Sequence, residues 1–342
     1  MSETFETKLV RAIEPIKQYA LAFAIYHCFE SGVFQAVEQG KANTLEHLAE
    51  YLIVDKVRLS ALIGLCEAED IFSRNGDVYA LTTKGREIMQ CRGWYEMFVG
   101  GYATTFMQLT GSLRNSKSYA TRYTARVASG SCAISHYDAI PLVERLVESK
   151  ELNKPCFLDV GCGVGAYLVE LCRKISGATG IGLEPNRGAF KEAKAFVESA
   201  DMSGSIEMHN VNLDAFLSRR QVSKPDIAIF CFVLHELLEE EGDVAVVTLL
   251  HRLIDSYPSM HIAVVEVDYP PGGVDFTGRP LAQSYYNPYF LLHAFTQQSL
   301  RSCSYWEALF ARAGLQVAAK LSTDTNVDST GYEIGYLLSG KQ

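Results

Sequence analysis

The chain lacks a long apolar run, a secretory leader and a surplus of basic residues. No stretch approaches the roughly 20 apolar residues that a membrane span requires, and no apolar signal region stands at the start. With 31 Lys and Arg against 40 Asp and Glu, the net charge is -9, whereas a nucleic-acid partner needs a basic face. These absences predict a soluble protein with no membrane or nucleic-acid partner, and they favour a small molecule as ligand.

Paired cysteines are also missing. The nine cysteines are scattered along the chain, and no two of them form a CxxC pair. This pattern is typical of a reduced protein whose thiols mostly fill core positions. We therefore expect a cytoplasmic location.

What the chain does have is enough apolar material for more than one core. Its 342 residues are 48% hydrophobic, which suffices for two domains. We predict a winged-helix dimerisation domain over residues 1–90, a helical linker and substrate-pocket segment over 91–150, and a catalytic domain over 151–342.

The first ninety residues show helical periodicity and end in a short hairpin. Apolar residues recur at three- and four-residue spacing, and two predicted strands flank the turn Asn75-Gly76. This order predicts a winged helix, a fold that can bind DNA. Acids outnumber bases between Lys41 and Gln90, so we expect a packing module that forms a homodimer rather than a DNA reader.

The linking segment is rich in aromatic residues and arginines. Its stretch GWYEMFVGGYATTFMQL either packs in a core or lines a pocket between domains. Arg114, Arg122 and Arg126 are the cations in this segment that could hold an anionic substrate through paired hydrogen bonds.

From Cys156 onward, strands and helices alternate, which predicts a parallel sheet with helices on both faces. The string CFLDVGCGVG reads as a strand followed by Gly161, Gly163 and Gly165, and then a helix whose N-terminus offers free N–H groups. The glycines also satisfy the dinucleotide pattern GxGxxA through Ala166. Glycine spacing alone therefore leaves the ligand open.

Acidic residues follow the next two predicted strands. Glu184 can accept hydrogen bonds from the ribose hydroxyls of an adenosine ligand, and Asp214 could meet the adenine amino group. The alternative for Asp214, and for Asp159 before the glycines, is a helix cap or turn residue. Further along, the stretches HIAVVEVDYP, QVAAKLS and GYEIGYLLSG predict strands, the last of them antiparallel between its neighbours.

An apolar strand ends abruptly in His235 and Glu236, within the stretch CFVLHELLEEEG. Ligands bind at this edge of such sheets, and a neutral imidazole there suits a general base. Glu236 would then orient the imidazole, or it would be an acid at the helix N-terminus that the helix dipole stabilises. A capping pair without chemistry is the structural alternative.

Taken in order, these motifs resemble a known family. LDVGCGVG, LEPN, LDAF and the HE pair, behind a winged helix, are similar to the S-adenosylmethionine-dependent methyltransferases of small-molecule O-methyltransferase architecture, over nearly the whole chain. The resemblance implies an α/β fold, a Rossmann-like sheet with its last strand antiparallel behind a helical N-terminal domain. It also implies these cofactor contacts: Asp159, Gly161, Gly163 and Gly165 near the methionine part of S-adenosyl-L-methionine, Glu184 at the ribose, and Asp214 with Phe216 at the adenine.

A second histidine points to a subgroup of that family. His293 lies in the apolar segment SYYNPYFLLHAFTQQ, where a lone histidine is usually a core residue. With His235 and Glu236 it supplies two imidazoles and a carboxylate, the facial set of Fe(II)-type sites. The trio resembles metal-dependent C-methyltransferases of α-keto acids, although some members carry an aspartate where this chain has Glu236.

The resemblance implies methylation of the β-carbon of an α-keto acid through an enolate that a divalent or ferric ion, iron or zinc, stabilises. It favours 2-ketoarginine, whose 3-methyl product would lead to 3-methylarginine. Glu96, Asp138, Asp275 and Glu333 are the acids that could meet its guanidinium group. The catalytic candidates are His235, Arg122, Arg126 and Tyr102.

Two other interpretations stay open. One is a metal-free O-methyltransferase that uses His235 as its general base. The other is a winged-helix regulator with a cofactor-sensing domain, although nothing in the charge pattern predicts DNA binding.

Overall fold

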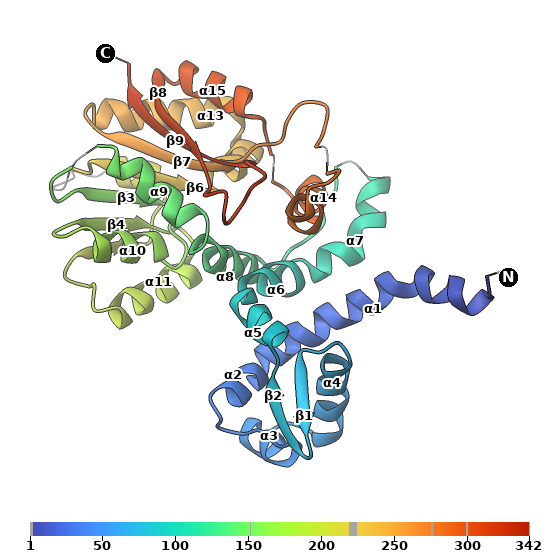
Figure 1. Ribbon diagram of the computed structural model, residues 1–342. Coiled ribbons are helices and arrows are strands. Elements are labelled where there is room, and N and C mark those ends of the chain that lie inside the picture. The colour runs from blue at the N-terminus through green and yellow to red at the C-terminus, as the bar shows by residue number, and fades with distance from the viewer. Residues whose placement is uncertain are drawn as a thin grey trace. The chain divides into compact units, whose positions relative to one another are not determined.

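The computed structural model describes residues 3–115, 117–150, 152–218, 224–274, 276–298 and 300–341. The chain forms two compact units, which are described separately (Figure 1). The first unit runs to Ala103 and includes Tyr123–Ala133, and the second contains Thr104–Arg122 and continues from Ile134. The predicted segment 91–150 is thus shared between both units, and its boundaries stay a prediction.

The first unit consists of helices and one hairpin. Several of its helices begin at a side-chain cap: Thr4 accepts a hydrogen bond from the backbone N–H of Thr7, and Asp55 from that of Arg58. Its elements are α1 (Phe5–Glu30), α2 (Val33–Glu38), α3 (Leu45–Leu52), α4 (Lys56–Ala68), β1 (Phe72–Asn75), β2 (Val78–Leu81), α5 (Thr83–Gln90), α6 (Arg92–Tyr95), the π-helix η1 (Glu96–Gly101) and most of α8 (Thr124–Ser135).

The hairpin of this unit follows from its turn. β1 and β2 pair antiparallel from Phe72↔Leu81 to Asn75↔Val78, and Gly76 supplies the positive φ of 59° that such a tight turn needs. The order of helices and hairpin is the one that the sequence predicts. The winged-helix class and the dimerisation role stay predictions.

The second unit is built on a seven-stranded sheet in the order β5-β4-β3-β6-β7-β9-β8. Neighbours from β5 to β7 pair in parallel, while β9 pairs antiparallel with both β7 and β8. The strands are β3 (Cys156–Val160), β4 (Thr179–Leu183), β5 (Ile206–His209), β6 (Ile227–Cys231), β7 (His261–Val267), β8 (Leu315–Ser322) and β9 (Glu333–Gly340). The predicted Rossmann-like sheet with its last strand antiparallel is confirmed.

Helices cover both faces of this sheet (Figure 1). The helices of the unit are α7 (Ala103–Arg114), α9 (Ala139–Glu148), α10 (Ala166–Lys174), α11 (Arg187–Ser199), α12 (Leu213–Leu217), α13 (Leu234–Ser256), the π-helix η2 (Ala282–Tyr286), α14 (Asn287–Phe295) and α15 (Cys303–Arg312). Because both faces are covered, the central strands β6 and β7 are almost wholly buried and consist mainly of apolar residues, with Glu266 of β7 as a buried exception.

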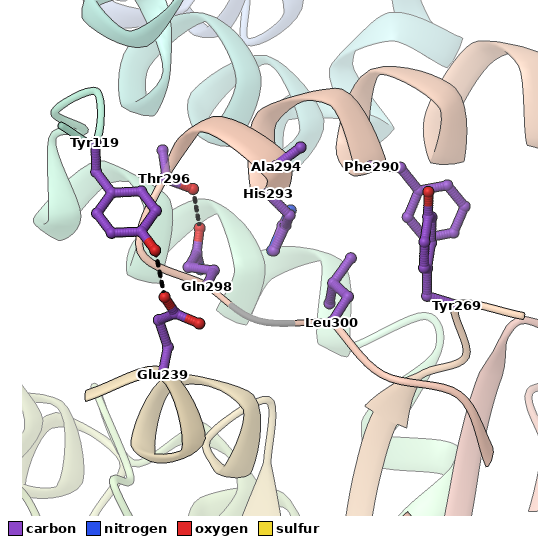
Figure 2. Close-up of a pocket in the computed structure, with 9 residues that line it drawn as sticks. All are labelled: Tyr119, Glu239, Tyr269, Phe290, His293, Ala294, Thr296, Gln298 and Leu300. Atoms are coloured by element: carbon purple, nitrogen blue, oxygen red, sulfur yellow. Dashed lines mark hydrogen bonds between the residues drawn. The ribbon is translucent and has the colours of Figure 1, made fainter. Parts of the chain in front are cut away.

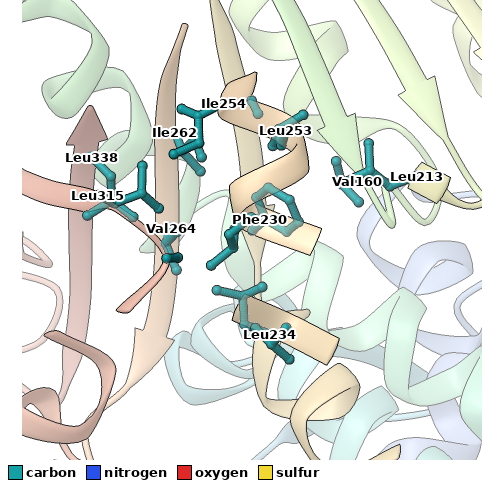
Figure 3. Packing of buried hydrophobic residues seen from close by; sticks show 14 of the residues in the cluster. Val160, Leu213, Phe230, Leu234, Leu253, Ile254, Ile262, Val264, Leu315 and Leu338 are labelled. Carbon is teal, nitrogen blue, oxygen red and sulfur yellow. The ribbon is translucent and has the colours of Figure 1, made fainter. Parts of the chain in front are cut away.

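The core on one face joins the central strands to α13. Phe230 of β6, Ile262 and Val264 of β7, and Leu253 of α13 are buried together (Figure 3). Replacing a buried leucine such as Leu253 by alanine costs about 2–5 kcal/mol in comparable cores. Leu253 packs the C-terminal part of α13 against the sheet, and Leu234, buried in the same cluster, holds the start of the helix.

The strand order reverses beside β3. The chain runs outward from β3 to β4 and β5, and then returns to place β6 on the other side of β3. In sheets of this kind, ligands bind beyond the carboxyl ends of the strands at such a switch point. A ligand site is therefore expected at the segments that follow β3, β4, β6 and β7.

None of the nine cysteines, all of which lie within the described residues, forms a disulfide bond. None of the helices in the described part of the chain has the length and apolar character to cross a membrane.

Candidate active site

The turn after β3 is shaped for close approach to a ligand. Gly161 has a φ of 72°, and a Cβ atom there would lie 3.0 Å from a methyl group of Val233. Gly165 has a φ of 80° and stands at the N-terminus of α10. Only glycine adopts these backbone angles without strain, and the N–H groups of a first helical turn, which have no partner within the helix, favour a polar or anionic ligand group.

Glu184 closes this turn from β4. Its carboxylate accepts hydrogen bonds from the N–H of Gly163 (3.1 Å) and of Asn186 (2.7 Å). Burial raises the pKa of Glu184. A carboxylate has lone pairs beyond these two contacts, so Glu184 retains acceptor capacity for a pair of ribose hydroxyls.

Asp159, at the end of β3, is 2% exposed, and its Oδ2 atom has no hydrogen-bond partner among the described residues. Burial and the nearby charge of Glu184 raise the pKa of Asp159 to about 8. A buried carboxyl group without a partner is costly, and a cationic ligand group would relieve that cost. The ammonium group of S-adenosylmethionine fits this requirement.

The two residues predicted at the adenine lie in α12. Asp214 is exposed and pairs with Arg252, while Asn212 caps the helix. Phe216 is 1% exposed in the core, with its ring 5.7 Å from that of His209. Their contact with adenine stays a prediction, and the side chain of Asp214 is engaged elsewhere.

His235 lies in the first turn of α13 and is held by Glu266 of β7. Its backbone N–H donates to Oε1 of Glu266 (3.2 Å), and its Nδ1 lies 2.8 Å from Oε2. Both side chains are at most 2% exposed. Burial lowers the pKa of His235, but the charge and hydrogen bond of Glu266 outweigh it, so the pKa is raised. The other ring nitrogen, Nε2, has no hydrogen-bond partner among the described residues.

His293 of α14 lies beside His235, and the two ring centroids are 5.8 Å apart. Its Nδ1 is 2.8 Å from the carbonyl oxygen of Tyr289. Burial lowers the pKa of His293 well below its ordinary value, with a further contribution from His235. His293 is therefore neutral, the form of imidazole that binds metal ions. The structure thus brings together two histidines that are far apart in the sequence.

Glu236 does not complete this pair as the sequence predicts. Its Oε1 accepts hydrogen bonds from Arg122 (2.8 Å) and from Gln298 (3.1 Å). Among the described residues, no three His, Cys, Asp or Glu side chains are gathered closely enough to hold a metal ion. The predicted three-residue metal set is therefore not assembled, because a cation and an amide already satisfy the carboxylate.

The remaining catalytic candidates lie apart from this cluster in the chain. Arg126 belongs to the first unit, where it pairs with Glu30 and Glu96. Tyr102 is also in the first unit and is 1% exposed. Their roles in catalysis stay predictions.

Of the acids considered for a guanidinium group, Asp138 and Glu333 are buried in the second unit. Burial raises the pKa of Asp138 to about 7 and that of Glu333 well above its ordinary value. Thr323 donates a hydrogen bond to Glu333. Glu96 accepts hydrogen bonds from Arg126 and Ser129 in the first unit, and Asp275 lies outside the described residues.

Sequence reasoning missed Glu266 and Gln298. Glu266 interrupts the apolar strand HIAVVEV, and a buried charge is rarely found without a partner. That interruption was a usable signal. Gln298 carries no such signal, because a glutamine after a helix is ordinary.

A cavity of about 250 Å³ lies next to His293. Figure 2 shows His293 and Ala294 of α14 on one side of it, Glu239 of α13 on another, and Tyr269 with Phe290 at one end. The hydroxyl of Tyr119 donates to Glu239 across its rim. The cavity thus adjoins the histidine pair.

Known proteins share both the sequence and the fold of this chain. No family model matches it. The 2-ketoarginine methyltransferase of Streptomyces arginensis is 38% identical over 342 residues, which covers 100% of this chain and 99% of that protein. The indolepyruvate C-methyltransferase of Streptomyces griseus is 28% identical over 218 residues, 63% of this chain and 64% of that protein.

Solved structures confirm the fold. Mitomycin 7-O-methyltransferase matches with a TM-score of 0.69 at 18% identity, covering 98% of this chain and 99% of its own. An O-methyltransferase from neocarzinostatin biosynthesis, in complex with S-adenosylmethionine, has a TM-score of 0.63 at 17% identity, with 94% and 96% covered. A pericyclic reaction enzyme also matches, with a TM-score of 0.65 at 16% identity and 99% and 90% covered. The fold alone therefore does not identify the reaction.

Proposed function

The chain belongs to the family of S-adenosylmethionine-dependent methyltransferases that includes 2-ketoarginine methyltransferase, and from that membership we propose that it methylates the β-carbon of an α-keto acid. The substrate we propose is 2-ketoarginine, 5-guanidino-2-oxopentanoate, and the product is its 3-methyl derivative, a precursor of 3-methylarginine. The observation that carries the proposal is the similarity to 2-ketoarginine methyltransferase over the full length of both chains. The second relative is named for C-methylation of indolepyruvate, another α-keto acid.

In this reaction the β-carbon loses a proton, and the electron pair left behind forms a bond to the methyl carbon of the cofactor. The bond between that methyl carbon and sulfur breaks, and its electron pair stays on sulfur to give S-adenosylhomocysteine. The protein must hold both reactants in line, because proximity and orientation supply much of the rate of such a transfer.

The chain offers groups for each part of this arrangement. Asp159 and the turn at Gly161 suit the amino-acid end of the cofactor, and Glu184 suits its ribose. Arg122 is the cation beside the histidine pair, only 17% exposed at its side chain, and it would bind the carboxylate of the keto acid. Arginine suits this role because its planar fork matches a carboxylate.

We further propose that His235 and His293 hold a divalent or ferric cation. The open Nε2 of buried His235 and the neutral ring of His293 support this proposal. A cation bound there supplies Lewis acidity to the keto acid. Glu236 would hold the ion with the two histidines only if its hydrogen bonds to Arg122 and Gln298 were broken, and Arg122 would then be available for the substrate carboxylate.

One observation favours a second candidate function, metal-free O-methylation. His235 is oriented by Glu266 through Nδ1, and its Nε2 points away from that bond, which is also how a general base is held. In that case His235 removes a hydroxyl proton from the substrate, and His293 only packs beside it.

A single assay separates these proposals. Purified protein is incubated with labelled S-adenosylmethionine and a panel of 2-ketoarginine, 4-methyl-2-oxopentanoate, indolepyruvate and a phenol, and the products are read by mass and by NMR. We expect 2-ketoarginine to gain one methyl group at C3. Methylation of oxygen in the phenol, with no keto acid converted, would establish the second candidate instead.

The same preparation tests the metal, by calorimetric titration of Zn²⁺ into chelator-treated protein. We expect saturable binding to the parent and binding weaker by about 10- to 100-fold for His293→Ala, because one ligand is lost. Equal binding by both proteins, or full C-methylation in chelator, would remove the metal proposal and leave C-methylation in place.

A further inference from the structure

The cavity beside His293 has a chemistry of its own. It is lined by Tyr119, Glu239, Tyr269, Phe290, His293, Ala294, Thr296, Gln298 and Leu300. Its volume of about 250 Å³ lies just below the range of about 300–1,000 Å³ typical of pockets for drug-sized ligands. The cavity therefore suits the side chain of a small metabolite.

The charge of this cavity is negative. Glu239 is the only carboxylate among the described residues that line it, and none of them is a lysine or arginine. The lining therefore favours a cationic group and disfavours an anionic one.

Glu239 is held ready to accept further hydrogen bonds. It is half-buried, and the hydroxyl of Tyr119 donates to its Oε1. That hydrogen bond raises the pKa of Tyr119, so its hydroxyl stays a donor. Tyr119 holds one oxygen of the Glu239 carboxylate. The carboxylate still has acceptor positions for a ligand that donates through two N–H groups.

The rest of the lining suits a flat cation. The rings of Tyr269 and Phe290 meet edge to face with centroids 5.0 Å apart, and Figure 2 shows both at one end of the cavity. A guanidinium group stacks on aromatic faces and pairs with carboxylates in a fixed fork, whereas a purely apolar side chain would offer no donor to the remaining acceptor positions of Glu239.

The spacing matches the proposed substrate. Glu239 follows His235 by one turn on α13, so the two side chains lie on the same face of the helix, with Cβ atoms about 5–6 Å apart. In 2-ketoarginine, two methylene groups separate the β-carbon from the guanidino nitrogen. A keto acid whose reacting end lies at the histidine pair can thus place its guanidinium group one helical turn away.

We infer that Glu239, positioned by Tyr119, binds the guanidinium group of the keto acid. Glu239 thereby sets the preference for keto acids with a cationic side chain over those with a neutral one. The inference is drawn from the cavity, the single carboxylate among its described lining residues and this spacing. The inference rests on the proposed function for its substrate. It adds the residue that selects the side chain.

The test is Glu239→Gln, which keeps the shape and removes the charge, with the exposed neighbour Glu240→Gln as matched control. For 2-ketoarginine we expect kcat/KM to fall by about 10- to 100-fold, mostly through KM, the loss expected for a hydrogen bond to a charged group. For 4-methyl-2-oxopentanoate, whose side chain is neutral, we expect kcat/KM to stay unchanged. Equal losses for both substrates, or none for 2-ketoarginine, would overturn the inference.

Direct binding keeps this test separate from that of the proposed function. Calorimetric titration of 2-ketoarginine in the presence of S-adenosylhomocysteine requires no turnover. Binding at least ten-fold weaker to E239Q than to E240Q supports the assignment of Glu239, even if the keto-acid panel gives no product. Equal binding to both variants rejects it, even if the panel succeeds.

Discussion

At the scale of single residues, His235 is central to both functions that we propose. Its surroundings are dry, and one ring nitrogen is committed to Glu266 while the other is open. Such a carboxylate–histidine pair fixes the tautomer and the direction of the open nitrogen, whether that nitrogen binds a metal or takes a proton. Glu266 therefore acts through His235 and is a positioning residue.

Replacing Glu266 by glutamine tests this role. The charge of Glu266 holds the pKa of His235 above its ordinary value, so E266Q lowers that pKa, and the acid limb of the profile of kcat/KM against pH moves to lower pH. We expect activity to fall by about 10- to 100-fold. NMR titration of the His235 ring and the pH–rate profile measure both effects.

The linked effect on stability has a definite sign. Because the pKa of His235 is raised on folding, its stabilising contribution is present below the unfolded pKa of about 6.5 and is lost as the pH rises through the folded value. E266Q removes this contribution at low pH. An unchanged acid limb in E266Q, matching the control E240Q, would contradict the role of Glu266.

At the scale of elements, α13 is the helix that carries the site. His235, Glu236 and Glu239 all lie before Gly242, which interrupts the helical angles with φ 80° and ψ 173°. Only glycine occupies this region of backbone space readily. The interruption allows the helical turns before Gly242 to differ in direction from the turns after it. The later turns pack in the core through Leu250 and Leu253.

Gly242→Ala should therefore destabilise the protein by about 1–3 kcal/mol, although a Cβ atom there meets no neighbour within 4 Å. The matched control is Gly111→Ala in α7, which also has open space but helical angles, and we expect it to stabilise by up to about 1 kcal/mol. Urea unfolding followed by circular dichroism measures both. If G242A were as stable as the parent, backbone strain would not be the reason for glycine at this position.

At the scale of the whole molecule, α1 presents apolar side chains that its own unit does not cover. Phe5, Leu9, Ile13 and Ile16 recur at three- and four-residue spacing and are between 42% and 78% exposed. A contiguous exposed apolar stripe of this kind marks an interaction surface. We propose that it forms the homodimer that the sequence predicts.

Two charges introduced into that stripe should separate the dimer. We expect the double variant I13E/I16E to elute as a monomer at micromolar concentration, with light scattering giving half the mass of the parent, because an unpaired carboxylate is costly in an apolar interface. Arg11→Glu, outside the stripe on the same helix, should leave the mass unchanged. A parent protein that is itself monomeric would dismiss the dimer.

Much of the fold was predictable from the sequence because its signals are local. The run from Cys156 to Val160, the glycines after it and the helix at Ala166 follow one another within a few residues, so periodicity and turn chemistry suffice to identify them. The strand pattern of GYEIGYLLSG and the places of His235 and His293 along the chain were visible in the same way. The antiparallel pairing of the last strand with β7 joins distant segments, and its prediction rested on the order of the elements near the C-terminus.

The site could not be predicted to the same depth, because its partners come from distant segments. Glu266 of β7 forms a hydrogen bond with His235. Arg122 and Gln298 donate hydrogen bonds to Glu236. Tyr119, more than one hundred positions earlier in the chain, donates to Glu239. A carboxylate can pair with a cation, an amide, a hydroxyl or a metal, and the sequence does not show which of these partners folding brings to it. By itself the sequence determined the alternation of strands and helices and the glycine-rich turn after β3, since periodicity and turn chemistry specify them. Only the tertiary structure decided which partner each buried polar group has, because that choice depends on which segments folding brings within hydrogen-bonding distance.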